Sequence, residues 1–245
     1  MARLEDAAAQ AGSLRETQHR PYPLPERRWV MGQTWRDLLF AHWRVPHDLL
    51  RPHVPEPLEL EQHDGSAWIG LTPFRVEGLR LRGALPLPLL SSFLELNCRT
   101  YVRAGDPPGI WFFSLDASSR AAVTAARRTY RLPYRHARIE AGGDWFRAET
   151  EGGGSFRARY HGLGMPAPAE PATLEHFLAE RYCLYAGDGE LRAEIHHAPW
   201  PLQPAAADIE QHGIAPVALE GEPVCHYAGR QDVVIWAAER YRSPR

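Results

Sequence analysis

The chain has 245 residues, and all 28 of its basic residues are arginine because the sequence contains no lysine. Without lysine, no side-chain amine can form a Schiff base, anchor pyridoxal phosphate or serve a phosphate-binding P-loop. The net charge is −2, so the composition gives no reason to expect nucleic acid binding, which needs a concentrated basic surface.

The cysteines and the N-terminal segment indicate a cytoplasmic protein without a membrane segment. Cys98, Cys183 and Cys225 form no Cys-x-x-Cys pair, and an odd number of cysteines argues against a disulfide framework. Segment 1–20 lacks the apolar core of a signal peptide, and no run approaches the roughly 18 apolar residues of a membrane span. We expect residues 1–27 to form a mobile or loosely docked arm, with a short alanine-rich helix stopped by nearby prolines.

Aromatic and leucine-rich segments after the arm predict a series of strands. The first covers 35–43, and Pro46 then begins a short helix that carries Leu49 and Leu50 on one face. Alternating patterns predict further strands at 67–74, 93–102 and 110–115.

The strand at 93–102 has one polar and one apolar face. Leu94, Leu96, Cys98, Thr100 and Val102 lie on the apolar face, which suits packing against the rest of a sheet. Phe93, Glu95, Asn97, Arg99 and Tyr101 share the other face, which points to solvent or into a polar cavity. If that face is interior, Glu95 must be paired or protonated.

The second half of the chain alternates helices and strands. Ser118 or Ser119 caps a helix at 121–128, and Thr173 caps a helix whose apolar face runs from Leu174 to Tyr185. The predicted strands lie at 130–139, 145–160 (a hairpin turning at 151–154), 191–197 and 233–236. Together with the earlier strands, this predicts an α+β fold with a β majority, as one domain over 28–240 followed by a tail at 241–245.

Few residues carry an obvious chemistry. Five arginines lie close together and can either bind a carboxylate or phosphate or coat an exposed helix end; they are Arg127, Arg128, Arg131, Arg135 and Arg138. The adjacent His196 and His197 point to opposite faces of a strand, so we expect no metal site and no cofactor. A lone catalytic histidine, His136 or His197, stays open beside a structural role. No Gly-x-Ser-x-Gly nucleophile motif is present.

Several motifs in a fixed order resemble the bacterial YqjF-like family of uncharacterised conserved proteins, a branch of the acetoacetate decarboxylase-like superfamily. They lie at 39–43, 45–46, 93–97, 99–102, 113–116, 126–127, 132–134, 180–182 and 197–202. The resemblance implies a cone-shaped, largely antiparallel β-barrel with a few flanking helices and an interior ligand cavity. It also implies a homo-oligomer, since decarboxylases of the superfamily assemble.

The resemblance also shows what this chain lacks. Decarboxylases of the superfamily carry a pattern like Gly-Arg-Glu-x-x-Gly-x-Pro-Lys-Lys, whose first lysine forms the Schiff base. Arg127 and Pro133 match this pattern, but Arg128 replaces its glutamate, Tyr134 stands at the Schiff-base position and Arg135 stands at the neighbouring cation. Because a phenol cannot form an imine, decarboxylation through a Schiff base is excluded.

The segment Phe93-Leu94-Glu95 resembles the superfamily strand that carries a cavity glutamate. Glu95 is therefore the expected general base, and Tyr134 the expected proton donor, with a pKa lowered by nearby guanidinium groups. The expected substrate-binding residues are Arg99, Tyr101, Arg127, Arg135 and His136.

Two functions remain open at this point. One is a lyase, hydratase or isomerase that acts on a small oxo-acid without a lysine. The other is a non-catalytic protein that binds or senses a small organic acid in the same cavity. In both, the partner is a small molecule, expected to be a carboxylate.

Overall fold

The computed structural model describes residues 2–86, 91–105 and 107–241. The strands are β1 (Met31–Val45), β2 (Glu59–Leu60), β3 (Ala67–Leu81), β4 (Phe93–Arg103), β5 (Pro108–Ala117), β6 (Tyr134–Gly142), β7 (Trp145–Thr150), β8 (Ser155–Gly162), β9 (Cys183–Ala186), β10 (Leu191–His196), β11 (Gln203–His212), β12 (Val224–Ile235) and β13 (Glu239–Arg240). The helices are α1 (Ala2–Gly12), α2 (His47–Leu50), α3 (Arg120–Tyr130) and α4 (Leu174–Ala179), with short 3-10 turns at Ser13–Arg15 and Arg51–His53. The predicted α+β fold with a strand majority is confirmed. None of the helices in this described part is long and apolar enough to cross a membrane.

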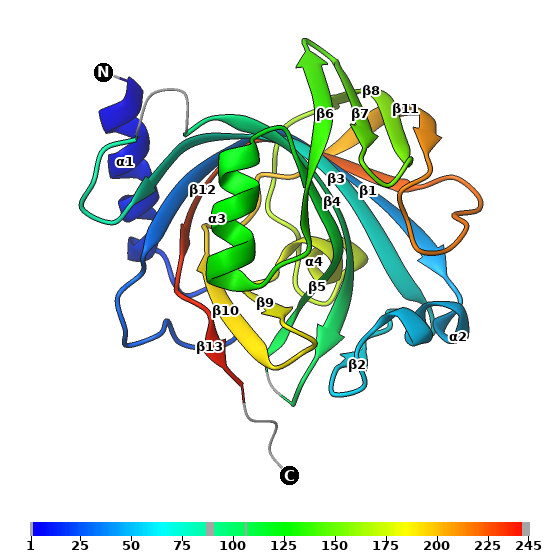
Figure 1. Ribbon diagram of the computed structural model, residues 1–245, viewed down its shortest axis with the longest axis horizontal. Coiled ribbons are helices and arrows are strands. Elements are labelled where there is room, and N and C mark those ends of the chain that lie inside the picture. The colour runs from blue at the N-terminus through cyan, green and yellow to red at the C-terminus, as the bar shows by residue number, and fades with distance from the viewer. Residues whose placement is uncertain (1, 87–90, 106, 242–245) are drawn as a thin grey trace.

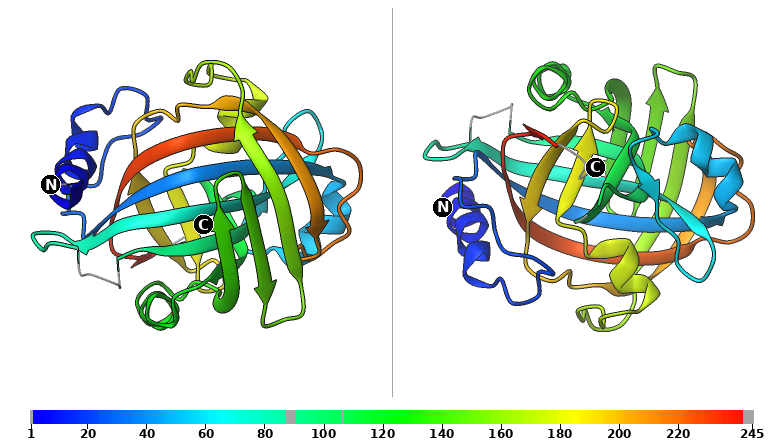
Figure 2. Two further views of the ribbon diagram at one scale, coloured as in Figure 1. Left: turned by 90° about the horizontal axis from the view of Figure 1, so that it is seen from above. Right: turned by 90° about the horizontal axis from the view of Figure 1, so that it is seen from below.

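All the described strands belong to one sheet, in the order β13-β10-β9-β5-β6-β7-β8-β11-β12-β1-β3-β4-β2. Two further pairings, β4 with β5 and β10 with β12, join strands that are distant in this order. The pairs β5–β6 and β5–β9 are parallel. The long strands β1, β3, β4 and β12 curve behind α3 (Figure 1), and they lie side by side when the molecule is seen from above (Figure 2). Strands β1, β3 and β4 therefore have an inner face toward α3 and an outer face that packs against β6–β8 of the same curved sheet.

A bulge bends β1 at Asp37. The pairing of β1 with β3 shifts between Arg36 and Ala41, and Asp37 has a φ of 53°. The Tyr160 hydroxyl donates a hydrogen bond to the Asp37 main-chain oxygen at 2.9 Å. Because a bulge strengthens the local bend and twist of a strand, β1 can curve around the interior.

The two faces of β4 differ as the alternation predicted. Leu96 and Cys98 pack on the outer face in one apolar cluster with residues of β6, β7 and β8. Glu95, Asn97 and Arg99 lie on the other face, and their exposed fractions are 4%, 5% and 7%. The polar face therefore points into the interior rather than to solvent.

The helix predicted at 121–128 is confirmed as α3. Ser119 caps it, since its Oγ accepts a hydrogen bond from the Ala122 main-chain nitrogen at 3.2 Å. Arg131 ends the helix in the left-handed conformation, with a φ of 53°. The strand predicted from residue 130 begins instead at Tyr134, because the helix still includes Tyr130.

The helix predicted from Leu174 to Tyr185 is shorter than its pattern indicated. Thr173 caps it as expected, but α4 ends at Ala179 and residues 183–186 form strand β9. This strand pairs with β10 on one side and with β5 on the other. The hydrogen bonds of two neighbouring strands outweigh the local helical periodicity here.

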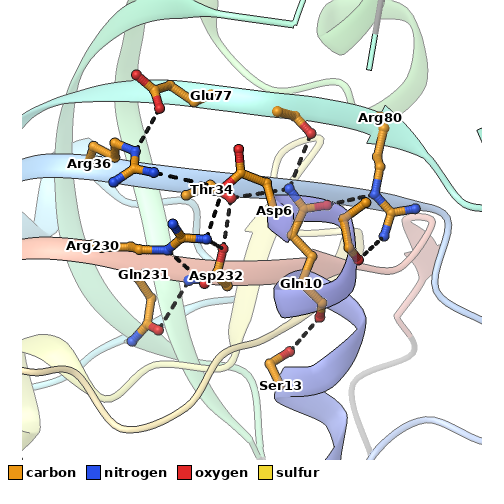
Figure 3. A network of polar contacts seen from close by, with 12 residues as sticks. Asp6, Gln10, Ser13, Thr34, Arg36, Glu77, Arg80, Arg230, Gln231 and Asp232 are labelled. Carbon is orange, nitrogen blue, oxygen red and sulfur yellow. Dashed lines mark hydrogen bonds and ion pairs between the residues drawn. The ribbon is translucent and has the colours of Figure 1, made fainter. Parts of the chain in front are cut away.

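The N-terminal segment is packed against the sheet by polar contacts (Figure 3). Gln10 is fully buried, and its Nε2 donates to Thr34 Oγ1 at 3.2 Å and to the Gly78 main-chain oxygen at 3.1 Å. Arg80 Nε donates to Gln10 Oε1 at 2.8 Å, and Asp6 accepts from Arg230 at 2.9 Å. The sequence predicted a mobile or loosely docked arm over 1–27 but not these contacts, because a single buried glutamine leaves no apolar pattern.

The C-terminal tail predicted at 241–245 lies outside the described residues apart from Tyr241. The Tyr241 ring packs edge-on against Tyr185, with 6.0 Å between the ring centroids. Its hydroxyl donates a hydrogen bond to the Ala104 main-chain oxygen.

Candidate functional site

A cavity of about 610 Å³ lies between the inner face of the sheet and α3. Most of its wall is apolar, with large side chains that include Trp35, Phe40, Phe74, Phe112 and Trp200. The polar side chains that reach it are Gln33, Thr72, Glu95, Asn97, Arg99, Thr129, Tyr130, Tyr134, Arg181 and His197. A mainly apolar cavity with a few convergent polar groups is typical of small-molecule sites.

Glu95 and Tyr134 meet on this wall. The Tyr134 hydroxyl donates a hydrogen bond to Glu95 Oε2 at 3.1 Å. β4 carries Glu95 inward, and β6 brings Tyr134 beside it because β6 runs parallel to the end of β5, which in turn pairs with β4. The two residues predicted as the catalytic pair therefore share one cavity.

The surroundings of Glu95 raise the pKa of its carboxyl group into the neutral range. The pKa of Glu95 is raised to about 8, mainly by burial and to a smaller extent by the nearby Asp116, while the hydrogen bond from Tyr134 acts in the opposite direction. A carboxyl group with such a pKa can be protonated or ionised near neutral pH, as a general acid or base requires.

The lowered pKa expected for Tyr134 was wrong. Burial and the neighbouring Glu95 raise the pKa of Tyr134 well above its usual value. Both nearby guanidinium groups are directed elsewhere: Arg127 Nε donates to the Tyr134 main-chain oxygen at 2.6 Å, and Arg135 binds Asp116. At neutral pH the Tyr134 phenol is therefore a hydrogen-bond donor rather than a source of phenolate.

Arg99 also reaches the cavity, as expected for a substrate-binding residue. Its Nη2 donates to the Leu178 main-chain oxygen at 3.2 Å, while its buried Nε has no hydrogen-bond partner. The guanidinium lies over the Phe40 ring, 5.3 Å from the centroid. Two more buried atoms on the cavity wall, Asn97 Oδ1 and Thr72 Oγ1, also lack partners.

Tyr101 lies outside the cavity lining, one step further along the same face of β4. Its hydroxyl donates to the Leu178 main-chain oxygen at 2.8 Å and lies 2.6 Å from His42 Nε2. Burial raises the pKa of Tyr101 and lowers that of His42. These contacts satisfy the Tyr101 hydroxyl within the protein.

The other three predicted binding residues also lie outside the lining. Arg135 makes two hydrogen bonds to the fully buried Asp116, at 2.9 and 2.8 Å. His136 Nδ1 lies 3.4 Å from a Glu151 oxygen, and Arg127 is largely exposed on α3. The structure thus brings together Glu95, Tyr134 and Arg99. Arg127, Arg135 and His136 lie elsewhere.

Arg181 and His197 also line the cavity, and neither was assigned to a ligand site from the sequence. Arg181 Nη1 donates to Glu61 Oε2 at 2.5 Å, so a carboxylate of the protein neutralises its charge. His197 lies between the Ala198 and Arg181 main-chain oxygens, and burial lowers its pKa. His197 was considered only as one of two lone histidines, and Arg181 only as part of a helix face, because neither belongs to a motif.

The sequence comparisons agree with the resemblance described above. Residues 32–237 match the model of the DUF2071 family, whose description is "uncharacterized conserved protein". The uncharacterized protein YqjF of Bacillus subtilis (strain 168) is 40% identical over 238 residues, which cover 91% of this chain and 98% of YqjF. The chain belongs to the YqjF-like family.

Solved structures of similar fold come from acetoacetate decarboxylase-like proteins. The enduracididine biosynthesis enzyme MppR in complex with pyruvate has a TM-score of 0.63 and 10% identity, covering 92% of this chain and 94% of MppR. An acetoacetate decarboxylase-like enzyme from Sphingomonas wittichii RW1 has a TM-score of 0.62 and 12% identity, covering 92% and 99%. Acetoacetate decarboxylase from Legionella pneumophila has a TM-score of 0.59 and 15% identity, covering 92% and 93%. At these identities the similarity establishes that this YqjF-like protein shares their fold, and nothing beyond the fold.

Proposed function

We propose that this YqjF-like protein is an acid/base enzyme that acts on a small oxo-acid in the cavity, with Glu95 exchanging a proton with the substrate. The observation that carries the proposal is the buried Glu95 carboxyl on the cavity wall, joined to Tyr134 by a hydrogen bond of 3.1 Å. Lyase, hydratase and isomerase reactions all need a group that takes and returns a proton. The pyruvate bound by MppR, a protein of the same fold, supports an oxo-acid as the substrate class.

The proposed step removes a proton from the carbon next to the substrate carbonyl. The Glu95 carboxylate takes this proton, and the electron pair of the C–H bond moves onto the carbonyl oxygen as an enolate. Arg99 holds the substrate carboxylate by charge-assisted hydrogen bonds, and Tyr134 keeps Glu95 in position. Because the chain has no lysine, this route replaces activation through an imine.

Solvent deuterium exchange tests the step without knowledge of the complete reaction. Pyruvate, 2-oxobutanoate and 2-oxooctanoate are incubated with the protein in D₂O, and proton NMR follows the signal of the carbon next to the carbonyl. We expect exchange faster than in buffer for at least one acid. The rate should rise with pH and level off above about 8, because only ionised Glu95 accepts a proton and its pKa is raised to about 8.

The Glu95→Gln variant assigns the step to this residue. We expect exchange to fall to the rate in buffer, while ligand affinity stays within about tenfold of wild type. Glu210→Gln, which removes an exposed carboxylate of β11, is the matched control and should exchange at the wild-type rate. Wild-type exchange in Glu95→Gln would refute the assignment.

The apolar wall favours a second candidate, a non-catalytic protein that binds or senses an organic acid. Apart from Glu95 and its neighbours, the lining is dominated by aromatic and aliphatic side chains, and arginine and tyrosine can bind an acid without converting it. Binding without exchange for every oxo-acid would favour this candidate over the enzyme.

We further propose that residues 28–240 form a single domain whose sheet closes as a cone-shaped barrel around the cavity. The pairings of β4 with β5 and of β10 with β12 support closure, because they link strands from opposite parts of the strand order. A single sheet that includes every strand from β1 to β13 supports the single domain.

A further inference from the structure

Arg99 is a buried cation without a carboxylate partner among the described residues. It is 7% exposed, and three other arginines are buried. Arg20 and Arg181 each lie within ion-pair distance of a glutamate, at 3.1 and 2.5 Å. Arg80 also has no carboxylate partner, but it donates hydrogen bonds to Gln10 Oε1 and to the Ala7 main-chain oxygen, both at 2.8 Å, whereas Arg99 Nε has no hydrogen-bond partner. Arg99 also contributes to the lowered pKa of His42, so this neighbour stays neutral. A buried charge is costly unless it is paired, so the position of Arg99 calls for an anion from outside the chain.

The unpartnered polar atoms lie next to one another on two paired strands. Thr72 of β3 is the direct cross-strand partner of Asn97 of β4, and Gly70 is the partner of Arg99. Thr72 is 1% exposed and Asn97 is 5% exposed, and both reach the cavity. The Thr72 hydroxyl and the Arg99 Nε therefore offer donors at one place, as a carboxylate group requires, whereas the unpartnered Asn97 Oδ1 is an acceptor.

The opposite wall of the cavity has almost no polar groups. The residues of α3 that line the cavity are Ala121, Ala122, Ala125, Ala126, Thr129 and Tyr130, so the hydroxyls of Thr129 and Tyr130 are the polar side-chain groups that this helix contributes. Alanines of this kind leave free space where larger side chains would pack against the sheet. Ala121, Ala125 and Thr129 follow each other at intervals of four, so they lie on one side of the helix.

The alanine wall also marks the opening of the cavity. Ala121, Ala125 and Thr129 are exposed to solvent although they line the cavity, and Leu81, another lining residue, is 65% exposed. Arg99 and Asn97, in contrast, are buried. The cavity thus has a polar inner end and an apolar opening, and its volume of about 610 Å³ is in the range that holds ligands much larger than pyruvate.

We propose that the ligand of this cavity is a monocarboxylic acid with an extended apolar tail, bound with its carboxylate at Arg99 and Thr72 and its tail along the alanine side of α3. This inference rests on the proposed function, because it assumes that the cavity is the substrate site. It adds the substrate class and its orientation. Consecutive inward residues of a strand lie ~7 Å apart, so an acid anchored near Arg99 and Asn97 brings its next carbons toward Glu95.

A series of saturated acids tests this orientation independently of turnover, since such acids carry no ketone. Acetate, butanoate, hexanoate and octanoate are titrated into the full chain by calorimetry. We expect the affinity to increase about fourfold for each added methylene, and 1-octanol to bind at least about tenfold more weakly than octanoate because it lacks the charge. Equal affinity along the series, or equal affinity for octanol and octanoate, would overturn the proposal.

Two variants locate the two ends of the ligand. Arg99→Met should weaken octanoate binding at least about tenfold, and it should raise the melting temperature of the ligand-free protein because it removes an unpaired buried charge. The control Arg157→Met, at an exposed arginine of β8, should leave the affinity unchanged. Ala125→Trp should weaken octanoate binding but leave butanoate within about twofold, since only the longer tail reaches α3.

The outcomes separate this proposal from the proposed function. Chain-length dependence without deuterium exchange for any oxo-acid would leave the ligand class in place and refute the enzyme. Exchange of pyruvate together with equal affinity for all the saturated acids would refute the ligand class and leave the enzyme in place. If Arg99→Met fails to fold, Thr72→Val and Ala125→Trp still decide the result, and wild-type octanoate affinity in both would overturn the proposal.

Discussion

Each member of the Glu95–Tyr134 pair influences the acidity of the other. The hydrogen bond donated by Tyr134 favours the ionised form of Glu95 and so opposes the rise in pKa that burial causes. The negative charge of Glu95 in turn raises the pKa of Tyr134. Tyr134 therefore lowers the pKa of the proposed base toward neutral pH while it stays protonated itself.

Replacing Tyr134 by phenylalanine should shift the pH profile of exchange upward. The variant removes the hydrogen bond that lowers the pKa of Glu95, so this pKa should rise by about one unit, the equivalent of one hydrogen bond to a charged group. The measurement is the pH at which the deuterium exchange rate is half-maximal. Tyr227→Phe removes a hydroxyl that donates to Asp37 at 3.1 Å outside the cavity lining and should leave that pH unchanged. A downward shift in Tyr134→Phe would contradict the pairing.

For single residues, the sequence predicts which face of a strand a side chain lies on better than it predicts which residue the side chain contacts. The alternation of β4 correctly separated inward Glu95 and Arg99 from outward Leu96 and Cys98. The arginines after α3 were less predictable. Arg135 binds Asp116, nineteen residues earlier, because β5 and β6 pair in parallel, and local spacing does not show this.

Among the elements, α1 depends on one buried glutamine. The Gln10 amide contacts three groups of β1 and β3, and a Cβ atom at Gly32 would lie only 2.4 Å from Gln10 Oε1. Glycine at position 32 therefore leaves the space that the Gln10 side chain occupies. The helix is fixed by polar complementarity rather than by an apolar stripe.

Gln10→Ala should weaken this attachment. The change leaves Arg80 Nε and the Gly78 main-chain oxygen without their partner, which should lower the free energy of unfolding by about 1–3 kcal/mol and expose residues 2–27 to protease. Chemical denaturation and limited proteolysis measure the two effects. Gln211→Ala, at an exposed position of β11, should match wild type. A Gln10→Ala protein with wild-type stability and wild-type protease resistance would show that the Gln10 contacts do not hold α1 on the sheet.

Strand pairing limits what the sequence predicts about elements. α3 was predictable because its cap, its alanines and its end are local features. The extent of α4 was not, because Tyr185 lies on a helical face in the sequence and yet pairs with β10 and β5 in the sheet. Partners from distant parts of the chain decide such segments.

For the whole molecule, the arrangement of the cavity links fold and function. The inner face of the sheet supplies Glu95, Asn97 and Arg99, α3 supplies a wall of small side chains, and β6–β8 cover the opposite face of β4 with an apolar cluster. The apolar cluster supports one side of β4 and leaves the other side free to line the cavity. One face of β4 therefore packs in the apolar core, and the other carries the polar residues of the cavity.

The most direct test of the account is a crystal structure of the Glu95→Gln protein with 2-oxooctanoate, since this variant should bind the acid without converting it. We expect the acid in the cavity, with its carboxylate hydrogen-bonded to Arg99 and the carbon next to its carbonyl within about 3.5 Å of the amide that replaces the Glu95 carboxyl. The tail should lie along Ala121 and Ala125. An acid bound at the surface arginines, or one whose carboxylate points to the opening beside α3, would contradict the account.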